Sequence, residues 1–202
     1  MTDKYAPQAE RWTETAYADH GGYLAHRAEL VVSLGPRLES GERVLDLACG
    51  DGGLAAFLPA DYVGVDASPE MVAAARLRSV DAELADLNEY EPREPVAATL
   101  CFRAIYYARD RRAFFEHVAG YTEKKFVFDL NPRQYRVGDV RADLEAAGFD
   151  RLELRPFLVP QTLALPRPLR TLAIALERNA LARALLQARF TYVCAAFRGT
   201  KT

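Results

Sequence analysis

The sequence predicts an α/β fold: a doubly wound, mostly parallel seven-stranded sheet with helices on both faces. Short apolar runs, typical of buried strands, alternate along the 202 residues with longer segments of helical periodicity. Parallel strands need crossover connections, and these helical segments are long enough to supply them. Half of the residues are hydrophobic, enough for one substantial core. We therefore expect a single domain over residues 1–202.

The expected elements follow one another without a low-complexity tract. The expected strands are 43–49, 61–66, 80–85, 96–102, 124–130, 151–159 and 189–197. The expected helices are 22–35, 52–58, 69–78, 110–120, 136–148 and 168–187. Residues 1–40, approximately, are expected to form an N-terminal helical lid. A helical insertion is expected at about 160–188, where ordinary loop lengths would give a short connection.

The composition of the chain argues against several classes of binding partner. The formal charge is −2, so there is no global basic field, and a nucleic-acid partner is not expected. The three cysteines are isolated, and no His, Cys or Asp cluster has metal-ligand spacing, so no metal site is expected. The N-terminal residues lack an apolar leader, and no apolar run is long enough to span a bilayer. A cytoplasmic protein is the expectation.

The segment "VLDLACGDGGLAAFL", residues 44–58, places glycines directly after the first expected strand. In doubly wound sheets ligands bind beyond the carboxyl ends of the strands, and glycines let the backbone approach them closely. The phosphate-binding pattern G-x-x-x-x-G-K-[ST] is absent, and no Lys or Arg occurs from 44 to 75. Instead an acid, Asp46, precedes the glycines. This arrangement favours a ligand with a cationic group.

Two further acids follow consecutive expected strands. Asp66 ends the second strand, twenty positions after Asp46, where a carboxylate can accept from the two hydroxyls of a ribose. Asp86 follows the third strand, where it can accept from an exocyclic amino group, and Leu87 offers apolar contact to a purine. Any one of these acids could simply cap a helix or face the solvent. Together and in this order, they favour a nucleoside with a cationic centre.

On these residues the sequence resembles the class I S-adenosylmethionine-dependent methyltransferases. The matching segments are "VLDLACGDGGLA", "YVGVDASPEMVAAAR" and "DAELADL", all within about 43–88. The resemblance implies a Rossmann-like fold and S-adenosylmethionine as cofactor, with its methionine part at the loop 48–53. Ala48 stands where the family has its first glycine. The cofactor-binding residues implied are Asp46, Ala48, Gly50, Gly52, Asp66, Ala67, Asp86 and Leu87.

The resemblance implies transfer of a methyl group to a small-molecule or lipophilic acceptor. Residues that follow the fourth and fifth strands are candidates for the acceptor side: Arg103, Tyr106, Tyr107, Asn131 and Arg133. No catalytic residue is assigned, but Arg103, Tyr106 and His20 are candidates. The alternative for each is an ordinary packing aromatic, a solvated charge or a structural histidine.

Two other functions stay open. Gly50, Gly52 and Ala55 match the short dinucleotide pattern G-x-G-x-x-G/A, so an NAD-dependent oxidoreductase is an alternative. That reading gives no role to Asp46 or Asp86. A non-catalytic S-adenosylmethionine-binding protein is the other alternative.

The expected last helix is amphipathic. Leu169, Leu172, Leu176 and Ala180 share one face, roughly opposite Arg167, Arg170, Arg178 and Arg189, and Glu177 is the one acid of the stretch. The segregation is imperfect, because Arg183 falls on the leucine face while Ile174, Leu181 and Leu185 fall among the basic residues. Two interpretations are open. The helix could pack into the core or a subunit contact with its arginines in solvent. Alternatively, residues 167–189 could make peripheral contact with an anionic membrane or admit a lipophilic acceptor.

Overall fold

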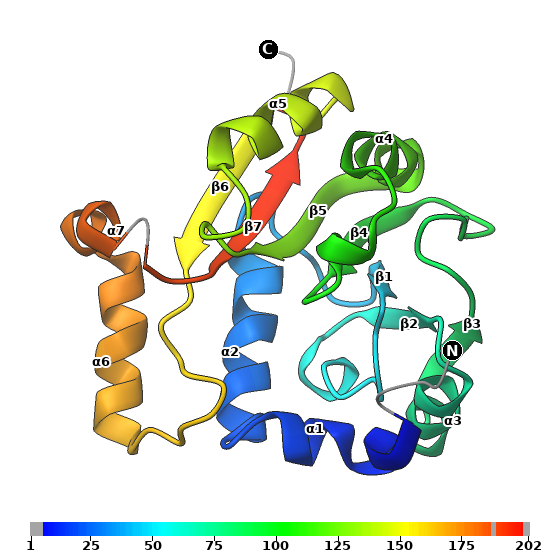
Figure 1. Cartoon of the computed structure of the whole chain (residues 1–202), viewed down its shortest axis with the longest axis horizontal. Helices are drawn as coiled ribbons and strands as arrows, with labels where there is room; N and C mark the ends of the chain where they lie inside the picture. Colours follow the sequence, from blue (N-terminus) through cyan, green and yellow to red (C-terminus); the bar gives the residue numbers. More distant parts are fainter. Residues whose placement is uncertain (1–5, 187–188, 200–202) are drawn as a thin grey trace.

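The structure is a computed structural model that describes residues 6–186 and 189–199. Its centre is a seven-stranded sheet with the strand order β3-β2-β1-β4-β5-β7-β6 (Figure 1). Strands β1 to β5 are parallel, and β7 runs antiparallel to both of its neighbours. The predicted mostly parallel sheet is confirmed. The strands are Arg43–Leu47, Asp61–Asp66, Asp81–Leu84, Val96–Cys101, Thr122–Leu130, Arg151–Pro156 and Tyr192–Phe197.

Helices cover both faces of this sheet. The α-helices are α1 Trp12–Ala16, α2 His20–Ser33, α3 Pro69–Leu77, α4 Arg111–Tyr121, α5 Val137–Ala146, α6 Arg167–Arg178 and α7 Ala180–Leu186. Helices α4 and α5 bury their apolar sides in one core, together with the phenylalanines of β5. Helix α2 fills the core on the opposite face, and α6 lies outside α2 (Figure 1). The order reverses between β1 and β4, which places the switch point beside the glycine segment.

A buried lysine joins α2 to the sheet. Lys125 of β5 is fully buried, and its Nζ donates to the carbonyl oxygens of Leu34 at 2.8 Å and Val32 at 3.2 Å. These carbonyls lie at the end of α2, where helix carbonyls lack partners of their own. Burial lowers the pKa of Lys125 to about 8. The ammonium group thereby fixes the carboxyl end of α2 against β5.

Several predicted boundaries were wrong. The first strand ends at Leu47 rather than 49, because Ala48 turns into the left-handed region with φ 61°. The expected helix 52–58 is a single 3-10 turn over Ala55–Phe57, since Gly52 also has positive φ and Pro59 follows closely. The strands expected at 151–159 and 189–197 are shorter, as Arg151–Pro156 and Tyr192–Phe197.

The expected single helix 168–187 was also wrong. It is divided at Asn179 into α6 and α7. The Asn179 side chain accepts from the amides of Leu181 and Ala182 at 3.0 Å, so it starts a new helix instead of continuing the old one. Near the N-terminus, a 3-10 helix at Ala6–Arg11 and α1 lie within the expected helical region 1–40, although they were not among the individual helices expected. In the described part of the chain, no helix has the length and apolar character needed to cross a bilayer.

Candidate cofactor and acceptor site

The loop after β1 is shaped by alternating left-handed residues. Ala48, Gly50 and Gly52 have φ values of 61°, 59° and 69°. This conformation costs a non-glycine residue about 1 to 2 kcal/mol, so Ala48 is held there by its surroundings. The amide of Cys49 donates to the carbonyl oxygen of Val65 at 2.9 Å, which ties the start of the loop to β2. The result is a tight turn at the carboxyl end of β1.

Asp66, at the end of β2, stabilises this loop through hydrogen bonds. One carboxylate oxygen accepts from the amide of Gly50 at 2.9 Å, and the other accepts from the amide of Ser68 at 2.9 Å. Ser68 in turn caps α3, because its hydroxyl accepts from the amide of Met71. The half-buried carboxylate of Asp66 is thereby fixed in orientation at the edge where ligands of such sheets bind.

Asp46 lies beneath the loop. It is 4% exposed, and one of its oxygens accepts from the Tyr62 hydroxyl at 2.6 Å. Burial raises the pKa of Asp46 to about 6, although the Tyr62 hydrogen bond and the Arg27 charge both oppose this shift. A buried carboxyl with such a pKa responds to any positive charge brought near it.

Asp86 has partners of its own at the surface. One of its oxygens accepts from the backbone and side-chain nitrogens of Asn88, at 2.8 and 2.7 Å. The other pairs with the guanidinium of Arg109 at 2.5 Å. These contacts lower the pKa of Asp86, with the backbone hydrogen bond from Asn88 as the largest cause. A ligand amino group at Asp86 therefore competes with Arg109. The neighbouring Leu87 is buried, and Ala67 beside Asp66 is exposed.

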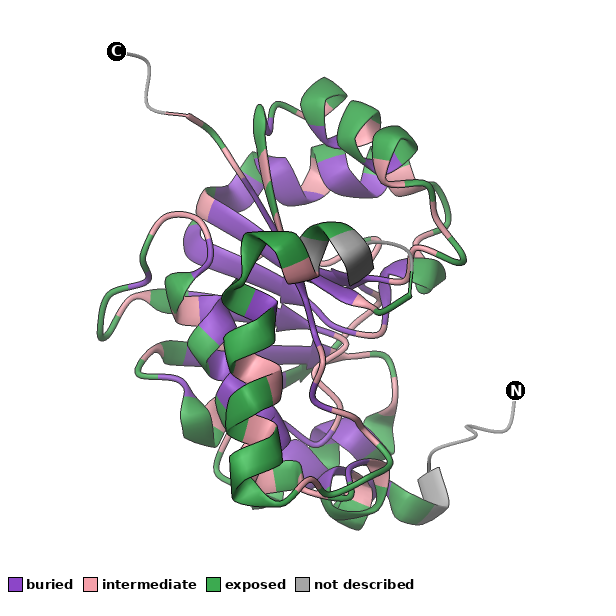
Figure 2. Cartoon of the chain, turned by 90° about the vertical axis from the view of Figure 1, so that its left-hand side faces the viewer, coloured by how far each residue is buried: buried purple, intermediate pink, exposed green. Residues whose placement is uncertain are grey.

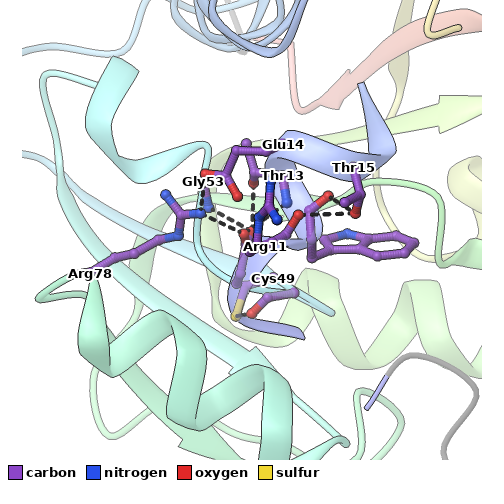
Figure 3. A network of polar contacts seen from close by, with 10 residues as sticks. Arg11, Thr13, Glu14, Thr15, Cys49, Gly53 and Arg78 are labelled. Carbon is purple, nitrogen blue, oxygen red and sulfur yellow. Dashed lines mark hydrogen bonds and ion pairs between the residues drawn. The ribbon is translucent and has the colours of Figure 1, made fainter. Parts of the chain in front are cut away.

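An acid inside the loop binds the N-terminal segment to it. Asp51 is 1% exposed and accepts from the Thr13 amide at 2.8 Å and from the Thr13 hydroxyl at 2.6 Å. Arg78 approaches Asp51 at 3.0 Å and Glu14 at 2.7 Å from the other side. Figure 3 shows Thr13, Gly53 and Arg78 within one network of polar contacts. A β-carbon at Gly53 would lie 2.1 Å from the Thr13 hydroxyl, so only glycine admits this contact.

Trp12 consequently lies over the loop. A β-carbon at Gly50 would lie 3.3 Å from Cδ1 of the indole, so the ring packs on the loop backbone. The Arg103 guanidinium lies 5.8 Å from the indole ring on the other side, at the carboxyl end of β4. Arg103 has φ 56°, and its amide donates to Asp129 at 2.6 Å. Strained backbone of this kind gathers at functional sites.

Asp129 and Arg27 form a buried charged pair beside Arg103. Arg27 of α2 is 4% exposed, donates to the Tyr23 hydroxyl at 2.9 Å and approaches Asp129 at 3.8 Å. Its guanidinium also lies 4.3 Å from the Phe102 ring centre, and its Nε has no hydrogen-bond partner. Burial raises the pKa of Asp129, while the Arg27 charge opposes that shift. Asp129 at the end of β5 thus lies beside two basic residues, Arg27 and Arg103.

The other predicted acceptor-side residues occupy different surroundings. Tyr106 and Tyr107 are about half exposed, and their rings contact each other with centroids 4.4 Å apart. Asn131 accepts from the Arg133 amide at 3.0 Å within a turn, and the Arg133 side chain is exposed. His20 is exposed at the start of α2 and interacts electrostatically with Glu14 and Asp19. No cluster of three or more His, Cys, Asp or Glu side chains in residues 6–186 and 189–199 is arranged to hold a metal.

Comparison with known proteins gives one consistent result. Residues 44–125 match the model of a methyltransferase domain family. Trans-aconitate 2-methyltransferase of Mycobacterium tuberculosis (strain ATCC 25177 / H37Ra) is 38% identical over 84 residues, covering 39% of this chain and 31% of the relative. The trans-aconitate 2-methyltransferase of Escherichia fergusonii is 30% identical over 116 residues, covering 53% of this chain and 45% of that one. These matches span about a third to a half of the curated relatives' length.

Solved structures share the fold over nearly the whole chain. A chain from the complex of the Haloferax volcanii Trm112 methyltransferase activator with a putative methyltransferase has a TM-score of 0.67 at 18% identity, covering 98% of both chains. Magnesium protoporphyrin IX methyltransferase from Synechocystis, solved with bound S-adenosylmethionine, has a TM-score of 0.59 at 16% identity, covering 94% of this chain and 85% of that one. The family match covers the glycine loop and the ends of β1 to β4, and it stops before Asp129.

Over residues 44–125 the chain matches a methyltransferase domain, and it is similar there to the class I S-adenosylmethionine-dependent methyltransferases. This similarity confirms the predicted resemblance, and it favours a methyltransferase over the NAD-dependent oxidoreductase. Within the matched region, the predicted Asp46, Gly50 and Asp66 lie together at one strand edge, whereas Asp86 lies further out with Arg109.

Sequence reasoning missed several residues that the structure places around the glycine loop and the neighbouring strand ends: Trp12, Thr13, Arg27, Asp51 and Asp129. Two of these residues could have been found from features of the sequence. Asp51 is an acid within a glycine loop that has no nearby basic residue in sequence. Arg27 lies at helical spacing from the buried Leu24 and Val31, and an arginine on an apolar stripe needs a buried partner.

Replacing Asp66 with alanine should weaken binding of S-adenosylmethionine by about 1.5 to 3 kcal/mol, the range for hydrogen bonds to a charged group. Asp86→Ala is the matched comparison, and its effect should be smaller because Arg109 already engages that carboxylate. Calorimetry with each folded variant measures the difference. Unchanged binding in Asp66→Ala would show that this acid only supports the loop.

Binding of the cofactor is expected to tighten as the pH rises to about 6. Below its pKa, the buried Asp46 carboxyl holds a proton, and a cationic ligand favours the ionised form. Binding therefore releases that proton, and affinity should rise by up to ~10-fold per pH unit before it levels off. Calorimetry across this range tests the slope. Asp46→Asn should bind with a flat profile, and an equally flat profile in the unchanged protein would contradict the prediction.

Proposed function

We propose that this chain transfers the methyl group of S-adenosylmethionine to a small-molecule acceptor that carries a carboxylate. The observation that supports it best is the juxtaposition of two unlike sets of groups at one sheet edge. The acids Asp46 and Asp66 adjoin the glycine loop, and the basic Arg103 follows the neighbouring β4. Acids suit the cationic cofactor, and a guanidinium suits an anionic acceptor.

The cofactor would lie along the carboxyl ends of β1, β2 and β3. In this arrangement Asp66 accepts from the ribose hydroxyls, Leu87 contacts the adenine and the loop 48–53 receives the methionine part. The buried Asp46 supplies negative charge beneath the sulfonium end. Residues 6–16 would act as the lid, because Trp12 packs on Gly50 while Asp51 holds Thr13.

The acceptor would approach from the side of β4. An Arg guanidinium binds a carboxylate through two parallel hydrogen bonds, and Arg103 is the half-buried arginine next to the loop. The related trans-aconitate 2-methyltransferases are named for a carboxylic acid substrate. By analogy, a small acid is the acceptor class we assign to this chain.

The chemistry then needs no general base. A carboxylate is already ionised at neutral pH, so its oxygen can attack the methyl carbon directly. The new oxygen–carbon bond forms as the carbon–sulfur bond breaks, and the electron pair of that bond stays on sulfur. The products are a methyl ester and neutral S-adenosylhomocysteine. Because the charges of sulfonium and carboxylate cancel, a water-poor site under Trp12 favours the transition state.

Two measurements test the proposal. Calorimetry with S-adenosylmethionine, S-adenosylhomocysteine and NAD should show binding of the first two only. Labelled S-adenosylmethionine should then label small di- and tricarboxylic acids in preference to amines and phenols. Cofactor binding with no transfer to any acceptor class would favour the non-catalytic alternative.

Substituting Arg103 tests the acceptor side separately. Arg103→Gln should raise KM for a carboxylic acid by roughly 10- to 100-fold, the loss expected for a charge-assisted hydrogen-bonded pair, with little change in cofactor binding. Arg112→Gln is the control, since Arg112 is exposed on α4 and pairs with Glu116. An unchanged KM in Arg103→Gln would remove Arg103 from the acceptor site.

A further inference from the structure

Helix α6 is held to the protein by its polar side. The Arg170 guanidinium pairs with Asp19 at 2.6 Å, next to the start of α2. A β-carbon at Gly22 would lie 1.9 Å from the same guanidinium nitrogen, so the glycine in α2 makes room for it. Arg178 at the other end of α6 pairs with Glu29 of α2. Two ion pairs thus connect the two helices near both ends of α6.

A buried acid fixes the rotation of α6 between these pairs. Glu177 is 1% exposed; one of its oxygens accepts from the Leu158 amide and the other contacts Nε2 of His26, both at 2.6 Å. Ile174, one turn earlier, packs against the core on the α2 side. Because a buried carboxylate must keep its partners, α6 cannot turn about its axis without a large cost.

The apolar side of α6 therefore faces outwards. Leu169, Leu172 and Leu176 are 53%, 55% and 40% exposed, and the adjoining Leu163 and Leu181 are 59% and 71% exposed. Figure 2 shows α6 as the outermost layer of this side of the molecule, largely exposed. We call these five leucines the leucine face. Of the alternatives left open by the sequence, packing of these leucines into the core does not fit, since the polar contacts with α2 occupy the inner side.

The segment that carries the leucine face is basic, although Arg170 and Arg178 are paired with Asp19 and Glu29. Residues 160–190 contain five arginines and a single acid, Glu177. Glu177 is buried, so it presents no negative charge to the outside, whereas Arg167 and Arg189 are exposed. Exposed leucines, with an exposed arginine at the start of α6 and another after α7, match an anionic lipid surface, which offers acyl chains to the leucines and phosphates to the arginines.

A second copy of the chain fits this surface less well. A stable protein interface uses about 20 to 30 residues on each side, and the leucine face offers only five leucines. Two such faces brought together would also place arginine near arginine. We propose that the leucine face binds peripherally to an anionic lipid bilayer, with α6 lying in the plane of the surface and α2 above it. This proposal does not depend on which methyl acceptor the chain uses.

Co-sedimentation with vesicles tests the proposal. The full chain should sediment with vesicles of phosphatidylcholine mixed with phosphatidylglycerol, and less with phosphatidylcholine alone. Raising the salt concentration should weaken the binding, because screening removes the contribution of the arginines. The double variant Leu169→Ser/Leu172→Ser should lower the lipid partition coefficient by about 10- to 100-fold, the loss expected for two partly buried leucines.

Leu77→Ser is the matched control, since Leu77 is 74% exposed on α3, away from this face. It should bind vesicles like the unchanged chain. No association with the anionic vesicles at low salt would overturn the proposal. So would a lipid-independent dimer that the double variant abolishes, because the leucine face would then be a contact between copies.

Discussion

Replacing Asp51 with alanine should release the N-terminal segment from the glycine loop and lower the free energy of unfolding by about 3 kcal/mol. The change leaves the buried amide and hydroxyl of Thr13 without their acceptor and removes one partner of Arg78. Trp12 would lose its anchor above Gly50, so binding of S-adenosylmethionine should weaken as well. Denaturant unfolding and calorimetry measure the two effects.

Two further variants isolate the cause of this effect. Asp51→Asn keeps a side chain of the same shape with one acceptor oxygen. Its free energy of unfolding should therefore lie between those of the unchanged chain and Asp51→Ala. Glu14→Gln removes only the more exposed partner of Arg78 and should change stability little. Cleavage of the N-terminal segment by a protease should increase most in Asp51→Ala, less in Asp51→Asn and little in Glu14→Gln. Unchanged stability and proteolysis in that variant would show that the segment is held by other contacts.

Replacing Arg27 with alanine should be the most destabilising single change considered, at about 3 to 5 kcal/mol near neutral pH. It leaves Asp129 buried without its cation and removes the charge that lies against the rings of Phe102, Tyr23 and Phe157. Arg27→Lys keeps the charge and should recover part of the loss. Denaturant unfolding of the three proteins gives the comparison.

The loss in Arg27→Ala should depend on pH. Burial already raises the pKa of Asp129 above that of an unfolded aspartate, so this carboxyl costs stability as pH rises through its folded pKa. Without Arg27 that pKa rises further. The deficit relative to the unchanged chain should therefore be smallest in acid, where Asp129 is protonated, and grow towards neutral pH. A deficit that is constant with pH would assign the effect to lost packing alone.

The sequence predicted the sheet well because its strands are buried on both faces and read as short apolar runs. It predicted helix ends less well. Asn179 interrupts the apolar pattern of α6 and α7 only weakly, yet its side chain caps α7. At residues 52–58, apolar residues suggested a helix, but the backbone demanded by Gly52 allows only a turn.

The candidate site was predictable only in part. Acids at strand ends can be found from spacing, because strand ends meet at one edge of a parallel sheet. The contact of Asp51 with Thr13 joins residues 38 positions apart, and no local pattern encodes it. The orientation of α6 was unpredictable for a similar reason: both sides of that helix could be buried, and Asp19, Gly22 and Glu29 on a distant helix decide which one is.

The place of β7 in the sheet sets the order in which the chain can assemble. Strands β5 and β6 are consecutive in sequence but pair with β7 rather than with each other. As the ribosome delivers the chain, the edge of β5 stays open until Tyr192–Phe197 has emerged, about 60 residues later. Until then an apolar strand edge is available for pairing with another nascent chain. The half of the sheet that carries Asp129 is thus completed last, after the half with the glycine loop has all of its strands.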